Sequence, residues 1–481
     1  MADAAHDSDF TDCVRRVVET RVMPGITFSS VRRLTGGASQ ETYRIEAEGP
    51  DGPMAFAMRR SPGGLPPETT AENPGLDVEA ELMRAARSAG VPEPEVFHVL
   101  EPGDGIGLGF IMEWIEGEAL GSRINRLPEF AELRTHLAYD CGVALARIHS
   151  IDIDAHGLRG RLGEMDPEAF VREMWERYQG YDTPQPMIDY TARWLLENLP
   201  ENPRRTLVHN DFRNGNFLVD SDGITAVLDW EVSHIGDPMR DLGWISTNSW
   251  RFGGTGPVGG FGEYDDFFRG YEETSGITVD PAHVHFWEVF GSFWWSVGCL
   301  TFADHYRNGP DKSVERAAVG RRTSECQIDC VNLIIPGPHT PMVEAPPRSW
   351  EMPEARELLT SVRDFLREDV MADTGGRVNF LARVAANTLD IALREAATGD
   401  ALRAWEAAAL TDLLGRSGDL GELKWALVHE LRGDRPLADN ALIDYLRTSV
   451  TNQIAIDQPK YPGFRTALGN GAADSSDRDG Q

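Results

Sequence analysis

LVHNDFRNGNFLVDSDGITAVLDWEVSHIGDPMRDLGWI, residues 207–245, is the stretch of sequence that decides the fold. Phosphoryl transfer needs a carboxylate that orients the attacking hydroxyl and oxygen ligands that hold Mg²⁺ against nucleotide phosphates. Asp211, Asn216 and Asp229 supply those groups. The five-residue step from Asp211 to Asn216 places a base and a metal ligand on one tight loop, and Asp229 follows an apolar strand predicted at 225–228. The stretch therefore predicts a phosphoryl-transfer site.

The run H-N-D-F-R-N-G-N followed by L-D-W-E resembles the catalytic segment of the aminoglycoside phosphotransferase and choline kinase superfamily, which shares the protein-kinase fold. The resemblance extends from about residue 30 to residue 335. It implies that Asp211 is the catalytic base, that His209 braces the loop, and that the metal region consists of Asn216, Asp229 and Glu231. The later run G-D-P-x-x-D, residues 236–241, resembles the segment that anchors the catalytic lobe of that superfamily.

Upstream, L-T-G-G-A-S-Q-E-T-Y at residues 34–43 resembles the nucleotide-covering turn of the superfamily. Glycine lets the backbone come close to a ligand because it has no Cβ. The resemblance implies that Gly36 and Gly37 approach phosphate and that Ser39 donates a hydrogen bond to it.

Lysine occurs only at Lys312, Lys424 and Lys460, so a phosphate contact in the first 311 residues must use arginine, histidine or backbone N–H groups. Strand alternation places Arg59 on the same face as Ala57 and leaves Arg60 on the other face, where we expect it to be solvated. Arg59 resembles the arginine that some members of the superfamily use at the phosphates. A guanidinium group can donate two parallel hydrogen bonds to phosphate oxygens, so arginine can chemically replace lysine at this position.

The residues predicted to complete the nucleotide site come from a helix and a hinge. A helical pattern over 77–89 contains Glu79, which resembles the partner of the phosphate-binding cation, and Glu81 is the alternative partner in the same helix. F-I-M-E-W-I-E-G at 110–117 resembles the hinge between two lobes. The resemblance implies that the adenine edge meets the backbone of Glu113, Trp114 and Ile115.

A glycine-rich segment, residues 249–262, follows the catalytic stretch. Its position suits a mobile lid over the acceptor, and its composition equally suits a disordered connection. Arg251 is its cation and is a candidate contact for an anionic acceptor. His149 ends a helical pattern, and we interpret it as a packed or capping residue.

Composition limits the classes of protein that remain. The chain has 481 residues, with 46 Lys and Arg against 77 Asp and Glu, a formal net charge of −31. This imbalance disfavours nucleic acid and anionic membrane surfaces as partners. Five cysteines without a C-x-x-C pair, and an N-terminus without a signal-like region, predict a cytoplasmic protein.

The length predicts two or three cores rather than one. Helical patterns at 353–370, 377–398, 400–415, 419–432 and 436–455 are sufficient for a helical bundle. The predicted fold class is α+β: a bilobal protein-kinase-like fold, with a small β-rich N-lobe and a mainly helical C-lobe, followed by an all-α helical bundle. The predicted boundaries are 1–112 for the nucleotide-binding lobe, 113–335 for the catalytic and substrate lobe, 336–350 for a proline-rich linker, 351–468 for the helical domain and 469–481 for a disordered tail.

These observations predict a Mg²⁺- and ATP-dependent enzyme that phosphorylates a hydroxyl group of a small molecule. The runs A-M-R-R-S-P, S-W-R-F-G-G and Y-E-E-T-S-G resemble the subgroup associated with acyl-CoA dehydrogenase-like proteins, which implies a hydroxyacyl-CoA or related acceptor. An acidic lobe would instead suit a polycationic aminoglycoside. A third interpretation is a catalytically weak, nucleotide-binding pseudokinase or scaffold. The helical domain is expected to pack on the kinase or to mediate dimerisation.

Overall fold

The computed structural model describes residues 2–34, 40–65, 74–342, 353 and 355–469. They form two compact units, each built from separate stretches of the chain. Unit 1 contains residues 1–166 and 201–287, and unit 2 contains residues 167–200 and 288–481. These units follow a different division from the five predicted segments, whose boundaries remain predictions. Residues 343–350 of the predicted linker and 470–481 of the predicted tail lie outside the described residues.

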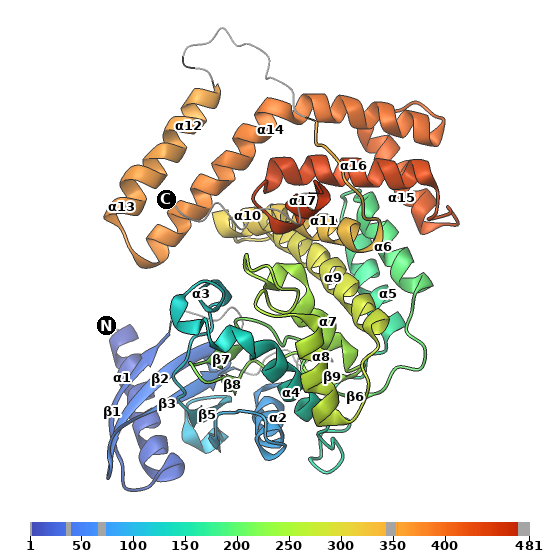
Figure 1. The fold of residues 1–481 in the computed structure, drawn as a ribbon. Coiled ribbons are helices and arrows are strands. Elements are labelled where there is room, and N and C mark those ends of the chain that lie inside the picture. Colours follow the sequence, from blue (N-terminus) through green and yellow to red (C-terminus); the bar gives the residue numbers. More distant parts are fainter. Residues whose placement is uncertain (1, 35–39, 66–73, 343–352, 354, 470–481) are drawn as a thin grey trace. The chain divides into compact units, whose positions relative to one another are not determined.

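Unit 1 begins with a five-stranded antiparallel sheet in the order β1-β2-β3-β5-β4 (Figure 1). Its strands are β1 (Thr27–Arg33), β2 (Glu41–Gly49), β3 (Gly52–Arg60), β4 (Val96–Val99) and β5 (Gly109–Glu113). Alternation places Ile45, Phe56 and Met58 on one face, where they form a core with α1 (Ala2–Val17) and the π-helical turn Val18–Val22. Burying each of these side chains contributes roughly 1.5–3 kcal/mol.

Helix α2 (Leu76–Ser88) packs against β4 and β5, with Val78, Leu82 and Ala86 among its buried residues. The connection that follows contains Gly90 in the left-handed region, at φ 82°, and leads into the V-P-E-P turn before β4. The β-rich part of the α+β prediction, including the β4–β5 pair, is therefore confirmed.

The rest of unit 1 carries four short strands that pair as β6–β9 and β7–β8. They are β6 (Thr206–Val208), β7 (Phe217–Val219), β8 (Ile224–Val227) and β9 (His234–Gly236). The helices are α3 (Gly121–Ile124), α4 (Leu137–His149), α7 (Met239–Ser246), α8 (Tyr264–Ser275) and the first turns of α9 (Pro281–Asn308). Helices α4 and α8 cross closely through Gly142 and Gly270, where a Cβ would lie 2.2 Å from the backbone oxygen of Phe267 or Tyr139.

All the regular elements in the described residues of unit 2 are helices (Figure 1). It contains the rest of α9 together with α5 (Pro167–Gln179), α6 (Pro186–Glu197), α10 (Val314–Arg321), α11 (Thr323–Ile334), α12 (Ala355–Phe365), α13 (Met371–Asp373), α14 (Gly376–Leu414), α15 (Leu420–Arg432), α16 (Asn440–Asp457) and α17 (Pro462–Ala467). Its core joins residues of α6 and α11 to residues of α14, α15 and α16, including Ile328, Leu410, Leu427 and Leu446. The predicted helical character of the C-terminal region is confirmed.

Two helix predictions need correction. The segments 377–398 and 400–415 form one continuous helix, α14, instead of two. Gly399 lies inside it, where it lowers helix propensity by about 1 kcal/mol without breaking the helix. Tertiary packing of α14 against α10, α15 and α16 outweighs that local preference.

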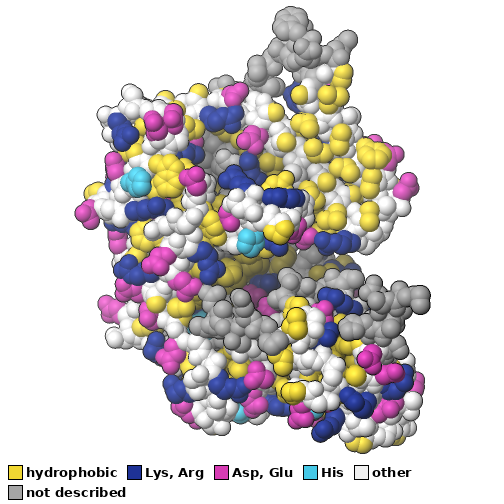
Figure 2. Space-filling model, turned by 180° about the vertical axis from the view of Figure 1, so that it is seen from behind, with side chains coloured by type: hydrophobic (Ala, Val, Ile, Leu, Met, Phe, Trp, Pro, Cys, Tyr) yellow, Lys and Arg dark blue, Asp and Glu magenta, His cyan; other side chains and the backbone are white. Residues whose placement is uncertain are grey.

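Helices α12 and α14 form a hairpin that is joined by ion pairs from Arg363 and Arg367 to Asp390, at 3.2 and 2.6 Å. Its surface carries exposed apolar side chains, which Figure 2 shows as a hydrophobic area over these helices. We call this set the hairpin patch: Leu358, Val362, Phe365, Val378 and Phe380, all at least 44% exposed. Among the described residues, no helix is both long enough and apolar enough to span a membrane.

Candidate active site

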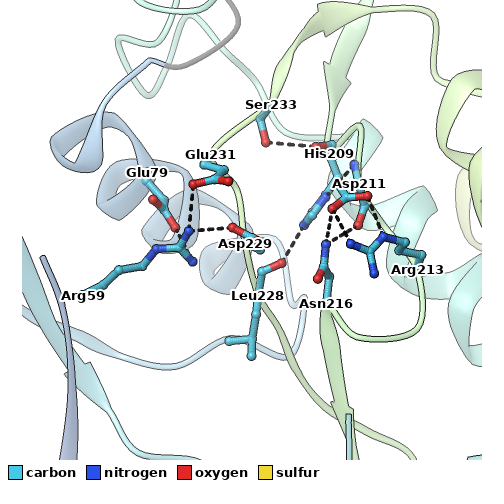
Figure 3. A network of polar contacts seen from close by, with 10 residues as sticks. All are labelled: Arg59, Glu79, His209, Asp211, Arg213, Asn216, Leu228, Asp229, Glu231 and Ser233. Carbon is cyan, nitrogen blue, oxygen red and sulfur yellow. Dashed lines mark hydrogen bonds and ion pairs between the residues drawn. The ribbon is translucent and has the colours of Figure 1, made fainter. Parts of the chain in front are cut away.

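The catalytic loop, residues 209–216, connects β6 to β7 and is braced by a buried histidine (Figure 3). The Nε2 atom of His209 lies 3.1 Å from the carbonyl oxygen of Leu228, and its Nδ1 accepts the backbone N–H of Asp211 at 3.3 Å. Burial lowers the pKa of His209, so the ring is neutral at pH 7. A neutral ring donates at Nε2 and accepts at Nδ1, which matches both contacts. His209 thus ties the loop to the end of β8.

A second anchor comes from Asp241 in α7, which is fully buried. Its two carboxylate oxygens accept the backbone N–H groups of His209 and Asn210 at 2.9 and 2.7 Å. His149 Nε2 lies 3.0 Å from the same carboxylate. Asn210 adopts φ 68°, in the left-handed region, so that consecutive N–H groups converge on one side chain. Burial alone would raise the pKa of Asp241, but its hydrogen bonds and the nearby histidines lower it overall.

The carboxylate of Asp211 is surrounded by three side-chain donors and keeps 20% of its side-chain surface exposed. Trp244 Nε1 donates to Oδ1 at 2.7 Å. Arg213 forks across the group, with Nε 2.9 Å from Oδ1 and Nη2 3.2 Å from Oδ2. The Nδ2 atom of Asn216 donates to Oδ2 and, at 2.9 Å, to the backbone oxygen of Asp211 (Figure 3). The carboxylate is therefore fixed in direction but still reachable.

Arg213 also stacks on an indole ring, with its guanidinium carbon 4.4 Å from the ring centre of Trp250. The neighbouring Asn214 is fully buried, and its Nδ2 donates to the backbone oxygens of Trp250 and Gly259 at 3.1 and 2.7 Å. The glycine-rich segment 249–262 is therefore hydrogen-bonded directly to the catalytic loop. Arg251 donates from Nε and Nη2 to the carbonyl oxygen of Ser246, at 3.2 and 2.7 Å, which ties its guanidinium to the end of α7.

Asp229 follows β8 and, at φ 68°, also adopts the left-handed region. Holding a non-glycine residue there costs about 1 kcal/mol or more and redirects the chain at the site. Arg59 Nη2 lies 2.6 Å from Asp229 Oδ1 and 3.2 Å from Glu231 Oε2. Its Nη1 lies 3.2 Å from Glu79 Oε1, so one guanidinium joins β3, α2 and the end of β8 (Figure 3).

Burial and charge act against each other in this cluster. Burial raises the pKa of Glu79 to about 7, although the Arg59 guanidinium opposes this shift. Burial alone would lower the pKa of Arg59, but the carboxylates of Glu79 and Asp229 raise it above its usual value. The arginine therefore stays charged.

The neighbouring predictions have different outcomes. Glu81 forms an ion pair with Arg84 at 3.4 Å, so this alternative partner faces away from Arg59. Arg60 binds Glu41 at 2.9 Å and is 15% exposed, which corrects the prediction that it is solvated.

The remaining predicted site residues belong to the predicted hinge and to the predicted nucleotide-covering turn. Glu113 ends β5, and its N–H donates to the carbonyl oxygen of Glu95 at 2.8 Å. Trp114 follows, with the guanidinium carbon of Arg44 4.5 Å from its ring centre, and Ile115 continues the connection toward α3. Gly36, Gly37 and Ser39 lie outside the described residues.

A metal site for Mg²⁺ is chemically compatible with these residues. No group of three or more His, Cys, Asp or Glu side chains in the described ranges is arranged to hold a metal ion. Mg²⁺ is commonly held by one or two carboxylates together with phosphates of the substrate, so this finding fits a site shared with a nucleotide. Because Asn216 uses Nδ2 toward Asp211, its oxygen can serve as a ligand. The oxygens of Asn216, Asp229 and Glu231 are the hard donors that Mg²⁺ prefers.

Four supporting residues were not predicted from the sequence: Arg213, Asn214, Trp244 and Glu93. Arg213 and Asn214 stand inside the quoted motif, and the cation two residues after the predicted base is a signal that points to Arg213. Trp244 lies three residues beyond Asp241, so it shares a helix face with that anchor. Glu93 Oε1 accepts Trp230 Nε1 at 3.1 Å, and burial raises its pKa well above its usual value. No sequence pattern signalled that contact, because 137 residues separate the pair.

The sheet, the hinge and the braced loop define a class, the protein-kinase-like phosphotransferases. A crystal structure from Ralstonia eutropha, described as that of an aminoglycoside phosphotransferase, has this fold and superposes with a TM-score of 0.54 at 20% identity. It covers 67% of this chain and 97% of its own. The model of the phosphotransferase enzyme family (APH) matches residues 30–277, and the chain belongs to that family. A domain of unknown function (DUF6285) matches residues 372–461.

Two curated relatives support the subgroup that the sequence resembles. Acyl-CoA dehydrogenase family member 10 of Mus musculus is 33% identical over 214 residues, and family member 11 of Gallus gallus is 32% identical over 227 residues. The matches cover 43% and 45% of this chain but only 19% and 28% of those proteins. The resemblance to the acyl-CoA dehydrogenase-associated subgroup is thus confirmed.

Proposed function

We propose that the protein transfers the γ-phosphoryl group of ATP to a hydroxyl group of a small molecule with Mg²⁺ as cofactor. The observation that carries this proposal is the Asp211 carboxylate. It is fixed by Trp244, Arg213 and Asn216, yet it remains partly exposed. A fixed, reachable carboxylate beside oxygen ligands is what positioning of an attacking hydroxyl requires.

Each residue has a defined part in the proposed reaction. Asp211 orients the acceptor hydroxyl and accepts its proton as the new oxygen–phosphorus bond forms. The bond between the γ-phosphorus and the bridging oxygen of ATP breaks in line, and ADP leaves with that oxygen. Asn216, Asp229 and Glu231 would hold Mg²⁺, which neutralises phosphate charge when bound. Arg59 would turn from Asp229 toward the nucleotide phosphates, with Glu79 holding its other nitrogen.

We propose that Arg213 binds the γ-phosphoryl group during its transfer. Its guanidinium neutralises Asp211, and Trp250 holds its plane from one side. An arginine fork fits phosphate oxygens as well as carboxylate oxygens. Arg213 can therefore exchange Asp211 for an equatorial phosphoryl oxygen during the reaction, which leaves the base free to meet the hydroxyl.

The acceptor that we propose is a hydroxyacyl-CoA or a related hydroxy acid derivative. The names of the curated relatives, acyl-CoA dehydrogenase family members, support this choice. An aminoglycoside is the alternative that the net charge of −31 favours. A catalytically weak pseudokinase is the third possibility, and the joint presence of Asp211, Asn216 and Asp229 weighs against it.

We also propose a cytoplasmic location, with neither nucleic acid nor membrane as a partner.

The test is Mg²⁺- and ATP-dependent turnover of the full chain against 3- and 4-hydroxyacyl-CoAs, aminoglycosides and choline-like alcohols. ADP release and the mass of the phosphoester are measured together. We expect phosphorylation of a hydroxyacyl-CoA, and loss of that product in Asp211→Asn while nucleotide binding persists. Turnover of an aminoglycoside alone would replace the proposed acceptor. Undiminished turnover by a folded Asp211→Asn variant would overturn the assignment of the base.

A further inference from the structure

Unit 2 contains a cavity of about 740 Å³ that the proposed phosphoryl-transfer residues do not line. Its walls come from the segment 181–187, the C-terminal part of α9, helices α10 and α11, and the α14–α16 region that matches the domain of unknown function. Figure 1 shows α14 and α16 alongside α10 and α11. A cavity of this volume accommodates a small organic molecule, and concave sites between packed helices are common ligand sites.

Four of the charged side chains that line the cavity form ion pairs with one another. Glu406 accepts the hydroxyl groups of Tyr445 and Ser449 at 3.0 and 2.8 Å and forms an ion pair with Lys424 at 2.9 Å. On another wall, Arg321 lies 2.7 Å from Asp457. A charged ligand would have to compete with these pairs and give up its own hydration, which is unfavourable in a partly buried site. An uncharged ligand leaves these ion pairs in place, and the hydration that it gives up costs less than that of an ion.

The lining also offers an aromatic face and a buried donor without a partner among the described residues. Trp405 and Tyr445 stack at an interplanar angle of 12°, and the Trp405 side chain is only partly buried. Asn452 is 3% exposed, its Oδ1 accepts the backbone N–H of Met342 at 2.8 Å, and its Nδ2 has no hydrogen-bond partner among the described residues. Buried donors without partners are rare, because each costs about 1–3 kcal/mol.

We propose that this cavity binds an uncharged, polyhydroxylated small molecule of about the size of a sugar. A hydroxyl group both donates and accepts, so one ligand can donate to the Glu406 carboxylate and accept from the Nδ2 atom of Asn452. The carbon–hydrogen face of a saturated ring suits the apolar surface of an indole. The site does not depend on Asp211 and therefore goes beyond the proposed phosphotransfer. It assigns a binding function to the junction between the phosphotransferase region and its appended helices.

Saturation-transfer NMR on the full chain, without ATP, tests the proposal with methyl α-glucoside, N-acetylglucosamine and myo-inositol as probes. Glucose 6-phosphate and inorganic phosphate serve as anionic comparators. We expect saturable binding of at least one neutral probe, weakened about tenfold or more in Trp405→Leu. Trp425→Leu is the matched control, since Trp425 stacks on His429 in α15 and does not line the cavity.

Glu406→Gln keeps the shape of the side chain and gives a second variant in case Trp405→Leu folds poorly. We expect it to weaken the same probe, because it removes the charged acceptor that the ligand hydroxyls would use. The proposal is overturned if no neutral probe saturates up to millimolar concentration. It is equally overturned if binding is unchanged in both Trp405→Leu and Glu406→Gln, or if only the anionic comparators bind.

Discussion

At the scale of single residues, the chemistry depends on how many groups share the Asp211 carboxylate. Three side chains donate to it, and only Arg213 among them carries a charge. Trp244 and Asn216 set its direction, whereas Arg213 sets the charge around it. In the proposed reaction, Arg213 would therefore act first on Asp211 and then on the transferred group.

Replacing Arg213 should remove the positive charge beside Asp211 while Trp244 and Asn216 still orient the carboxylate. We expect Arg213→Ala to lower kcat by about 10²-fold with a smaller change in KM, because a charge-stabilising contact is lost mainly in the transition state. Arg213→Lys should recover part of the loss, since it restores charge without the fork. Arg269→Ala is the control: Arg269 stacks on Tyr139, 5.3 Å from its ring centre, away from the site. Equal kcat values for Arg213→Ala and Arg269→Ala would contradict the role.

The burial of His234 leads to a prediction of how the stability of the protein depends on pH. Burial lowers its pKa from 6.5 to about 4. Below pH 6.5 His234 therefore binds a proton in the unfolded chain, whereas in the folded chain it binds one only near pH 4. The free energy of unfolding consequently falls as the pH falls from 6.5 to about 4. The contribution reaches roughly 3 kcal/mol. Urea unfolding at pH 7 and pH 5 should show a smaller acid loss for His234→Asn than for the wild type. Parallel losses would exclude His234 as a cause.

What the sequence predicted at this scale was the set of reacting groups, because Asp211, Asn216 and Asp229 stand at spacings that chemistry constrains. What it missed were partners fixed only by folding. Glu93 reaches Trp230 across 137 residues, and Arg60 binds Glu41 through strand pairing. Such contacts depend on register and packing, which residue spacing alone does not contain.

At the scale of elements, α7 organises the catalytic loop through one side chain. The strands around the loop are only three or four residues long, too short to hold it by themselves. Asp241 supplies acceptors for two consecutive N–H groups, and His149 of α4 holds that carboxylate in turn. Sequence analysis identified the G-D-P-x-x-D run as an anchor but could not name what it binds.

Asp241→Ala should therefore reduce both stability and catalysis. Two buried N–H groups would lose their acceptor, at a cost of about 3 kcal/mol or more. We expect a lower midpoint of urea unfolding and a kcat reduced in the fraction that remains folded. Asp237→Ala is the matched control, because Asp237 is also buried but binds His283 and Trp287 instead of the loop. It should lower stability while leaving kcat nearly unchanged. A normal kcat in Asp241→Ala would refute the anchoring role.

At the scale of the whole molecule, the two units contain different candidate sites. Unit 1 holds every described residue of the proposed phosphoryl-transfer site. Unit 2 holds the cavity and the hairpin patch. Two helices alone cannot enclose a core, so the apolar side chains of the patch are expected to be covered by another surface. The two predicted roles of the helical domain, packing on the kinase and dimerisation, provide such a surface in different ways.

Phe365→Glu distinguishes these two roles. If the patch mediates dimerisation, light scattering after gel filtration should show a wild-type dimer and a monomeric variant. If it packs on the kinase, the mass should stay that of one chain while the Tm of the variant falls. Leu65→Glu, at an exposed leucine of unit 1 outside the hairpin patch, should change neither quantity. If Phe365→Glu also changes neither, both roles are wrong.

The placement of lysine has a practical consequence for how this protein can be detected. Lys312, Lys424 and Lys460 all belong to unit 2, and the stretches that form unit 1 contain no lysine. Where kinases offer an amine at the phosphates, the nucleotide site that we propose would offer the Arg59 guanidinium, which is a far weaker nucleophile because it stays protonated. Acylating or sulfonylating ATP analogues, which label nucleotide sites through a lysine amine, would leave this site unmodified. Surveys of kinases in cell extracts that rely on such reagents would therefore overlook the protein, even when it is abundant and active.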